Sequence, residues 1–141
     1  MKFNSDLEEF KLKYKAFGER SILIEWPSEI EESILKDVLI FKNKLENSNI
    51  KELVEVKSAY SSILISYSST IDDVYGEIST LKVHYSARVI LTKCASRRWR
   101  VPVCYDEEFG IDLTEFSEYK KRSVSELIKR HYEAIYTVYF I

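Results

Sequence analysis

The chain has 141 residues, of which 45% are apolar and 31% are charged, and it contains only three glycines and two prolines. This length and apolar content predict one domain, or one and a fraction, with a genuine core, and they exclude a disordered chain. The net charge of -2, from 21 basic and 23 acidic residues, creates no overall field that would attract a nucleic acid or a membrane.

The sequence shows no targeting or metal-binding signature. Residues 1–9 carry Lys2, Asp6, Glu8 and Glu9 in place of the apolar core of a signal peptide, and no apolar stretch is long enough to cross a bilayer. The two cysteines, Cys94 and Cys104, lack the spacing of a metal site. These features predict a cytoplasmic protein with reduced thiols and no metal.

Two predicted strands open the chain. Apolar and lysine residues alternate over residues 12–17, and residues 21–26 place Ile22, Ile24 and Trp26 on one side. Because Gly18 stands between these runs, we expect a hairpin.

The first predicted helix spans about residues 29–46. Pro27 ends the preceding strand, and Ser28 with Glu31 forms the spacing of a capping box. The expected buried stripe consists of Ile30, Ile34, Val38, Phe41 and Leu45.

A second hairpin and helix follow. Residues 50–57 and 63–67 alternate as strands, with Val54 and Val56 on one face. Thr70 is the predicted cap of the second helix, whose end is open, since residues 89–91 fit either a helix or an irregular connection. Its expected buried stripe consists of Val74, Ile78, Leu81 and Tyr85.

The last third begins and ends with a predicted strand. Residues 98–105 alternate like a strand, but Pro102 confines it to an edge, a bulge or a passage between sheets. Two short helices should follow, the first capped by Asp112 and the second opened by Ser123. Residues 136–141 form an apolar run typical of a buried strand.

The order of these elements predicts an α+β protein. From residue 21 to residue 103 the pattern is β-α-β-β-α-β, which is the split βαβ sandwich of ferredoxin-like folds with an extra N-terminal strand. Right-handed crossovers would place both helices on one face of the sheet. We expect a first domain over residues 1–97 and a second segment over residues 98–141.

The apolar run at the end of the chain suggests that the second segment is incomplete. A carboxylate after a buried strand is costly, and no turn follows residues 136–141. We therefore expect a sequence cut off within a second domain, with this run disordered or buried in a homo-oligomer.

Two charged clusters admit both a functional and a structural interpretation. The basic residues Lys93, Arg97, Arg98 and Arg100 surround Trp99. They would either bind an anionic partner or a nucleic acid, or protect a solvated sheet edge from aggregation. Acidic residues gather after residue 105, where they would hold a cation, transfer protons, or simply form a polar loop with a helix cap; they are Asp106, Glu107, Glu108 and Asp112.

Two further side chains suit a binding site. His131 follows the apolar stripe of its helix. There it would contact a substrate, act as an acid or base, or be a half-buried histidine bonded to a carbonyl. Tyr136 would direct its hydroxyl into a pocket or pack. No glycine-rich phosphate loop is present, and no catalytic residue can be assigned. The candidate binding residues are Tyr105, Asp106, Glu108, Asp112, His131 and Tyr136.

Three runs in the last third resemble a known family. They are V-P-V-C-Y-D-E-E-F-G-I-D-L (residues 101–113), S-V-S-E-L-I-K-R-H (residues 123–131) and Y-T-V-Y-F-I (residues 136–141). They resemble the kinase A inhibitor family, which is also named after allophanate hydrolase subunit 1 and after the B-type component of 5-oxoprolinase. The early G-E-R-S-I-L-I-E-W (residues 18–26) is similar to the first hairpin of that family.

The resemblance implies a small α/β domain followed by the entry segment of a cyclophilin-like barrel. The G-F-x-P-G-F-x-Y-L stretch that follows residue 141 in the family is not part of this sequence. The chain also has Asp106 and Glu107 where a glycine pair is common, and Ile111 where proline is common, so its loop should be stiffer and more charged.

Two activities follow from the resemblance. The first is that of a subunit of an ATP-dependent hydrolase that opens the lactam of 5-oxoproline to glutamate. ATP, a divalent cation and partner subunits would then serve the full complex, and no cofactor would bind this segment. The second is inhibition of a sporulation sensor histidine kinase by binding its dimerisation domain, without chemistry. An interaction module without either activity is the third possibility.

Overall fold

The computed structural model describes residues 10–87 and 97–140, which fall into two compact units. Unit 1 consists of residues 10–87 with 139–140, and unit 2 consists of residues 97–138. The assignment of two domains with a boundary at residue 97 stays a prediction. Lys93, Cys94, Ile141 and the open end of the second helix at residues 89–91 lie outside the described residues.

Unit 1 contains a four-stranded antiparallel sheet with the order β1-β2-β4-β3. Its strands are β1 (Lys13–Ala16), β2 (Ser21–Glu25), β3 (Leu53–Ser58) and β4 (Ser62–Tyr67). Gly18 has a φ of 74° in the β1–β2 turn, a left-handed conformation that glycine adopts without strain. Both predicted hairpins are therefore confirmed.

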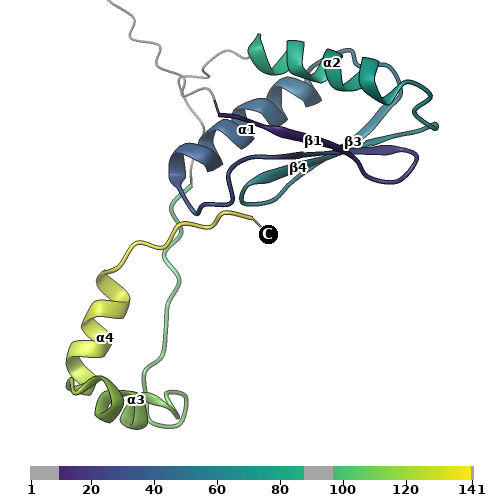
Figure 1. Cartoon of the computed structure of the whole chain (residues 1–141). Coiled ribbons are helices and arrows are strands. Elements are labelled where there is room, and N and C mark those ends of the chain that lie inside the picture. The colour runs from purple at the N-terminus through teal and green to yellow at the C-terminus, as the bar shows by residue number, and fades with distance from the viewer. Residues whose placement is uncertain (1–9, 88–96, 141) are drawn as a thin grey trace, which may run out of the picture. The chain divides into compact units, whose positions relative to one another are not determined.

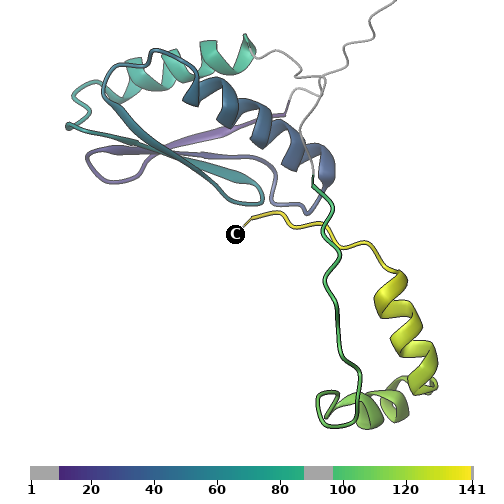
Figure 2. The same cartoon turned by 180° about the vertical axis from the view of Figure 1, so that it is seen from behind.

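Helices α1 (Glu32–Glu46) and α2 (Val74–Ser86) cover one face of this sheet, as the crossover argument predicts (Figures 1 and 2). The core between them is apolar apart from Asp37 and the polar atoms of its aromatic side chains, and its aromatic centre is formed by Trp26, Phe41 and Tyr85. Phe41 and Tyr85 meet edge-on, with ring centroids 5.1 Å apart. None of the described helices is both long and apolar enough to span a membrane.

Two helix starts differ from the prediction. Helix α1 begins after Glu31, because the Ser28 hydroxyl bonds the Tyr60 hydroxyl at 3.2 Å and does not cap the helix. Ile30, predicted as buried, is therefore 75% exposed. Helix α2 is capped by Asp73 and not by Thr70, since the Asp73 carboxylate accepts the Gly76 N–H at 2.9 Å.

A register shift between Leu53 and Glu55 corrects one strand prediction. Because a bulge adds a residue to one strand, it breaks the alternation that placed Val54 and Val56 on one face. Val56 is buried, whereas Val54 is 63% exposed.

Unit 2 contains helices α3 (Leu113–Lys120) and α4 (Val124–Glu133) and no strand among its described residues. The predicted strand over residues 98–105 is wrong, because no described segment pairs with it. The predicted strand from residue 136 onward is likewise absent over residues 136–140.

The fold is therefore α+β, but its ferredoxin-like description is not confirmed. Strands β2 and β3 each pair antiparallel with β4 between them, which makes them parallel and agrees with a split βαβ unit. The edge beside β2 is occupied by β1, however, and not by residues 98–105. The cyclophilin-like nature of the second segment stays a prediction.

Candidate functional site

Three of the six candidate residues meet in unit 2. The Tyr105 hydroxyl lies 2.6 Å from His131 Nδ1, within hydrogen-bond distance. Their rings meet edge-on, with centroids 5.7 Å apart and planes at 86°. Tyr105 is half-buried and His131 is exposed, so the histidine ring is held by a partner while it remains accessible to solvent.

Tyr136 is the third member of this group. Its ring centroid lies 5.6 Å from that of His131, and its O–H donates to the His131 carbonyl oxygen at 3.4 Å. This contact forms after α4 has ended at Glu133, where the C-cap residue Ala134 is extended with φ -72° and ψ 144°. We call Tyr105, His131 and Tyr136 the tyrosine–histidine cluster.

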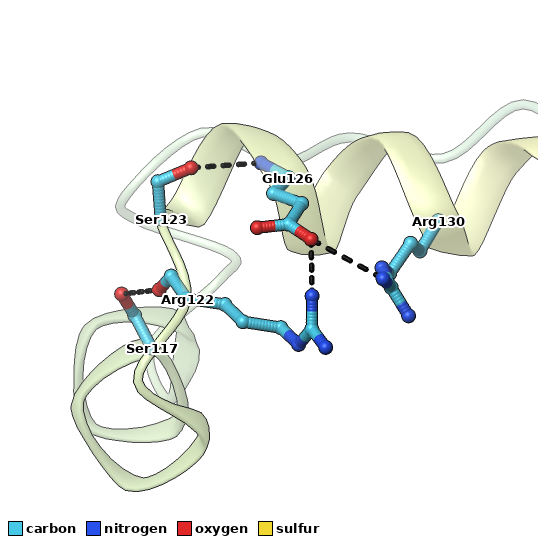
Figure 3. Close-up of polar contacts among 5 residues, drawn as sticks. All are labelled: Ser117, Arg122, Ser123, Glu126 and Arg130. Atoms are coloured by element: carbon cyan, nitrogen blue, oxygen red, sulfur yellow. Dashed lines mark hydrogen bonds and ion pairs between the residues drawn. The ribbon is translucent and has the colours of Figure 1, made fainter.

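Helix α4, which carries His131, is fixed at its start by local sequence. The Ser123 hydroxyl caps the helix by accepting the Glu126 N–H at 3.2 Å. Glu126 then forms ion pairs with Arg122 and with Arg130, the latter at 3.3 Å (Figure 3). The arginine at position 130 immediately precedes His131, so these contacts order the turn that bears the imidazole.

The turn between α3 and α4 is closed by backbone bonds. Lys121 adopts the left-handed conformation, with φ 51°, and the Arg122 N–H returns to the Ser117 carbonyl at 3.1 Å. The Ser117 hydroxyl donates to the Arg122 carbonyl at 2.5 Å (Figure 3). This is the hydrogen-bond pattern of a Schellman ending, which here holds the two helices of unit 2 together.

The hydrogen bond at Nδ1 decides what the cluster can do chemically. Within the described residues His131 Nε2 has no hydrogen-bond partner, so it is the ring nitrogen open to a ligand. If the Tyr105 O–H donates to Nδ1, then Nε2 carries the proton and is a donor; in the opposite tautomer Nε2 is an acceptor. The arrangement therefore suits proton transfer or hydrogen bonding at Nε2.

The acidic candidates do not join this cluster. The Asp106 carbonyl accepts the N–H groups of Phe109 and Gly110, so this residue forms a turn. Asp112 occupies the N-cap position of α3 as predicted, although its side chain makes no capping bond, and Glu108 is exposed. The described residues contain no group of three or more His, Cys, Asp or Glu side chains able to hold a metal ion.

Sequence reasoning missed a second polar group, which lies in unit 1. The buried Asp37 accepts the Trp26 Nε1–H at 2.8 Å and the Tyr85 O–H at 2.7 Å. Asp37 falls on the apolar side of its helix, and a charged residue at a core position was the available signal. Because an indole donor and a phenol donor surround the carboxylate inside the core, we interpret this group as structural.

Two tyrosines of unit 1 have shifted ionisation. Burial, followed by the hydrogen bond that its O–H donates to Glu77 at 2.7 Å, raises the pKa of Tyr67 well above its usual value. Hydrogen bonds from Ser28 and then Ser61 lower the pKa of the half-buried Tyr60. Neither tyrosine belongs to the tyrosine–histidine cluster.

Two depressions on the surface are lined by residues of unit 1 and not by the tyrosine–histidine cluster. Open depressions of about 420 Å³ and 220 Å³ adjoin α2, where Lys82 and Ser86 line both. They are shallow and contain no acid–base pair, so we give the geometry of the cluster more weight than the volume of these depressions.

The comparison with known protein families agrees with the resemblance found in the sequence. Residues 12–141 match the model of the family described as carboxyltransferase domain, subdomain C and D. The chain is also similar to a crystal structure of the conserved uncharacterized protein PH0987 from Pyrococcus horikoshii. The two are 31% identical, with a TM-score of 0.47, over 91% of this chain and 58% of that one. The chain thus spans 58% of the length of that protein, and no curated protein matches it.

Proposed function

Because the chain belongs to the carboxyltransferase subdomain C and D family, we propose that it is part of a subunit of an ATP-dependent amidohydrolase that opens the lactam of 5-oxoproline to glutamate together with partner subunits. This family includes domains of the kinase A inhibitor, of allophanate hydrolase and of the B-type component of 5-oxoprolinase, and its match covers residues 12–141. The observation that supports a chemical role is the bond between Tyr105 and His131 at 2.6 Å.

In this proposal His131 exchanges a proton with the substrate at Nε2. Opening a lactam breaks the carbon–nitrogen bond, and a proton must reach the departing nitrogen. The hydroxyl of Tyr105 holds Nδ1, and the Tyr136 ring packs against the imidazole and limits its rotation. His131 is thus the proton-transferring residue of the proposal, and Tyr105 and Tyr136 are its positioning residues.

ATP and any divalent cation are assigned to the partner subunits. The chain has three glycines and no phosphate-binding loop, and the described residues contain no group suited to a metal. We therefore assign no step at the phosphates to the described residues.

The test is an ATP-dependent 5-oxoproline assay of the full-length protein with its partner subunits. We expect His131→Gln to lower kcat by about 10²- to 10⁴-fold, the range for loss of a general acid or base. The matched control is His84→Gln, because His84 is the other histidine of the chain and lies on α2, with Nδ1 3.5 Å from the Ser48 hydroxyl. The control should retain full activity.

A third variant separates proton transfer from packing. Tyr105→Phe keeps the ring that packs against His131 but removes the hydroxyl from Nδ1. We expect a loss in kcat of about tenfold with little change in KM, since the imidazole loses only its orientation. Equal activity of the native protein and His131→Gln would reject proton transfer by the tyrosine–histidine cluster. If no folded complex formed glutamate, 5-oxoproline would be rejected as the substrate.

Inhibition of a sensor histidine kinase is the second candidate, because unit 2 exposes many large apolar side chains. None of its described residues is buried, and Trp99, Val101, Ile135 and Val138 are among those left open. Such a surface favours protein binding over chemistry. Inhibition of kinase autophosphorylation by the full-length protein, unchanged in His131→Gln, would favour this candidate over the first.

A further inference from the structure

We draw no further inference here: the strongest candidate, the open depression beside α2 in unit 1, where the Lys82 ammonium lies 5.4 Å from the centroid of the Tyr14 ring, carries no proposal because nothing in the structure shows what covers it.

Discussion

Removing the hydroxyl of Tyr85 tests whether the buried group around Asp37 stabilises unit 1. Tyr85→Phe deletes the O–H that donates to Asp37 at 2.7 Å but keeps the ring that meets Phe41 edge-on. The Trp26 Nε1–H, at 2.8 Å, remains on the carboxylate. The substitution therefore removes one hydrogen bond to a buried charged acceptor without opening a large cavity.

The expected cost follows from that bond. A hydrogen bond to a charged group contributes about 1.5–3 kcal/mol, so Tyr85→Phe should lower the free energy of unfolding by about 2 kcal/mol. Asp37→Ala should cost more, about 3–5 kcal/mol, because it leaves the donors of both Trp26 and Tyr85 without their acceptor and removes packed atoms. For a unit of this size, 2 kcal/mol corresponds to a fall in Tm of roughly 8–16 °C.

The assay is urea unfolding followed by the fluorescence of Trp26 in a Trp99→Phe background, so that the signal comes from unit 1 alone. Tyr75→Phe is the control, because Tyr75 lies on the same helix and is 86% exposed. The reasoning is refuted if Tyr85→Phe costs no more than this control, within about 0.5 kcal/mol. If Asp37→Ala then still lowered the free energy of unfolding by about 3–5 kcal/mol, packing rather than hydrogen bonding would be the source of stability.

Two further predictions concern pH and helix capping. Because burial raises the pKa of Tyr67 above its usual value of 10.0, the neutral phenol is favoured in the folded state. The contribution of the neutral phenol to the free energy of unfolding is complete below pH 10 and is lost as the pH rises toward the folded pKa. Above pH 10 the free energy of unfolding should fall more steeply in the native protein than in Tyr67→Phe, by up to about 1.4 kcal/mol per pH unit. Urea unfolding at a series of alkaline pH values measures this difference, and parallel curves of the free energy of unfolding against pH would contradict it. Ser123→Ala should destabilise α4 by about 1 kcal/mol, seen as faster amide exchange in its first turn, since it removes the cap on the Glu126 N–H. Ser125→Ala is the matched control, and equal exchange in both variants would exclude a capping role.

The strands of unit 1 could be predicted from the sequence where only one face of the strand is buried. Ile22, Ile24, Ile63 and Ile65 alternate with less buried residues, so their period of two placed β2 and β4 with the correct inner face. The helix starts were misjudged because local capping signals compete with tertiary hydrogen bonds: Ser28 bonds Tyr60 instead of its own helix. The exposure of Val54 depends on a bulge, which leaves no periodic trace in the sequence.

Unit 2 shows the limit of the same reasoning. The helices α3 and α4 are local structures, and Asp112 and Ser123 marked their starts correctly. A strand needs a neighbour, however, and the alternation in residues 98–105 shows only the capacity to pair. Tyr105, His131 and Tyr136 were chosen singly from the sequence, because the end of α4 and the hydrogen bonds that join these residues are not visible in it.

The two units are stabilised by different kinds of contact. Unit 1 has a closed apolar core, whereas no described side chain of unit 2 is buried and its helices are held by capping, ion pairs and one Schellman turn. Contacts of that kind contribute about 1 kcal/mol each or less, so the amide groups of α3 and α4 should exchange faster than those of α1. Equal protection of the helices in the two units would show that unit 2 has a source of stability beyond these local contacts.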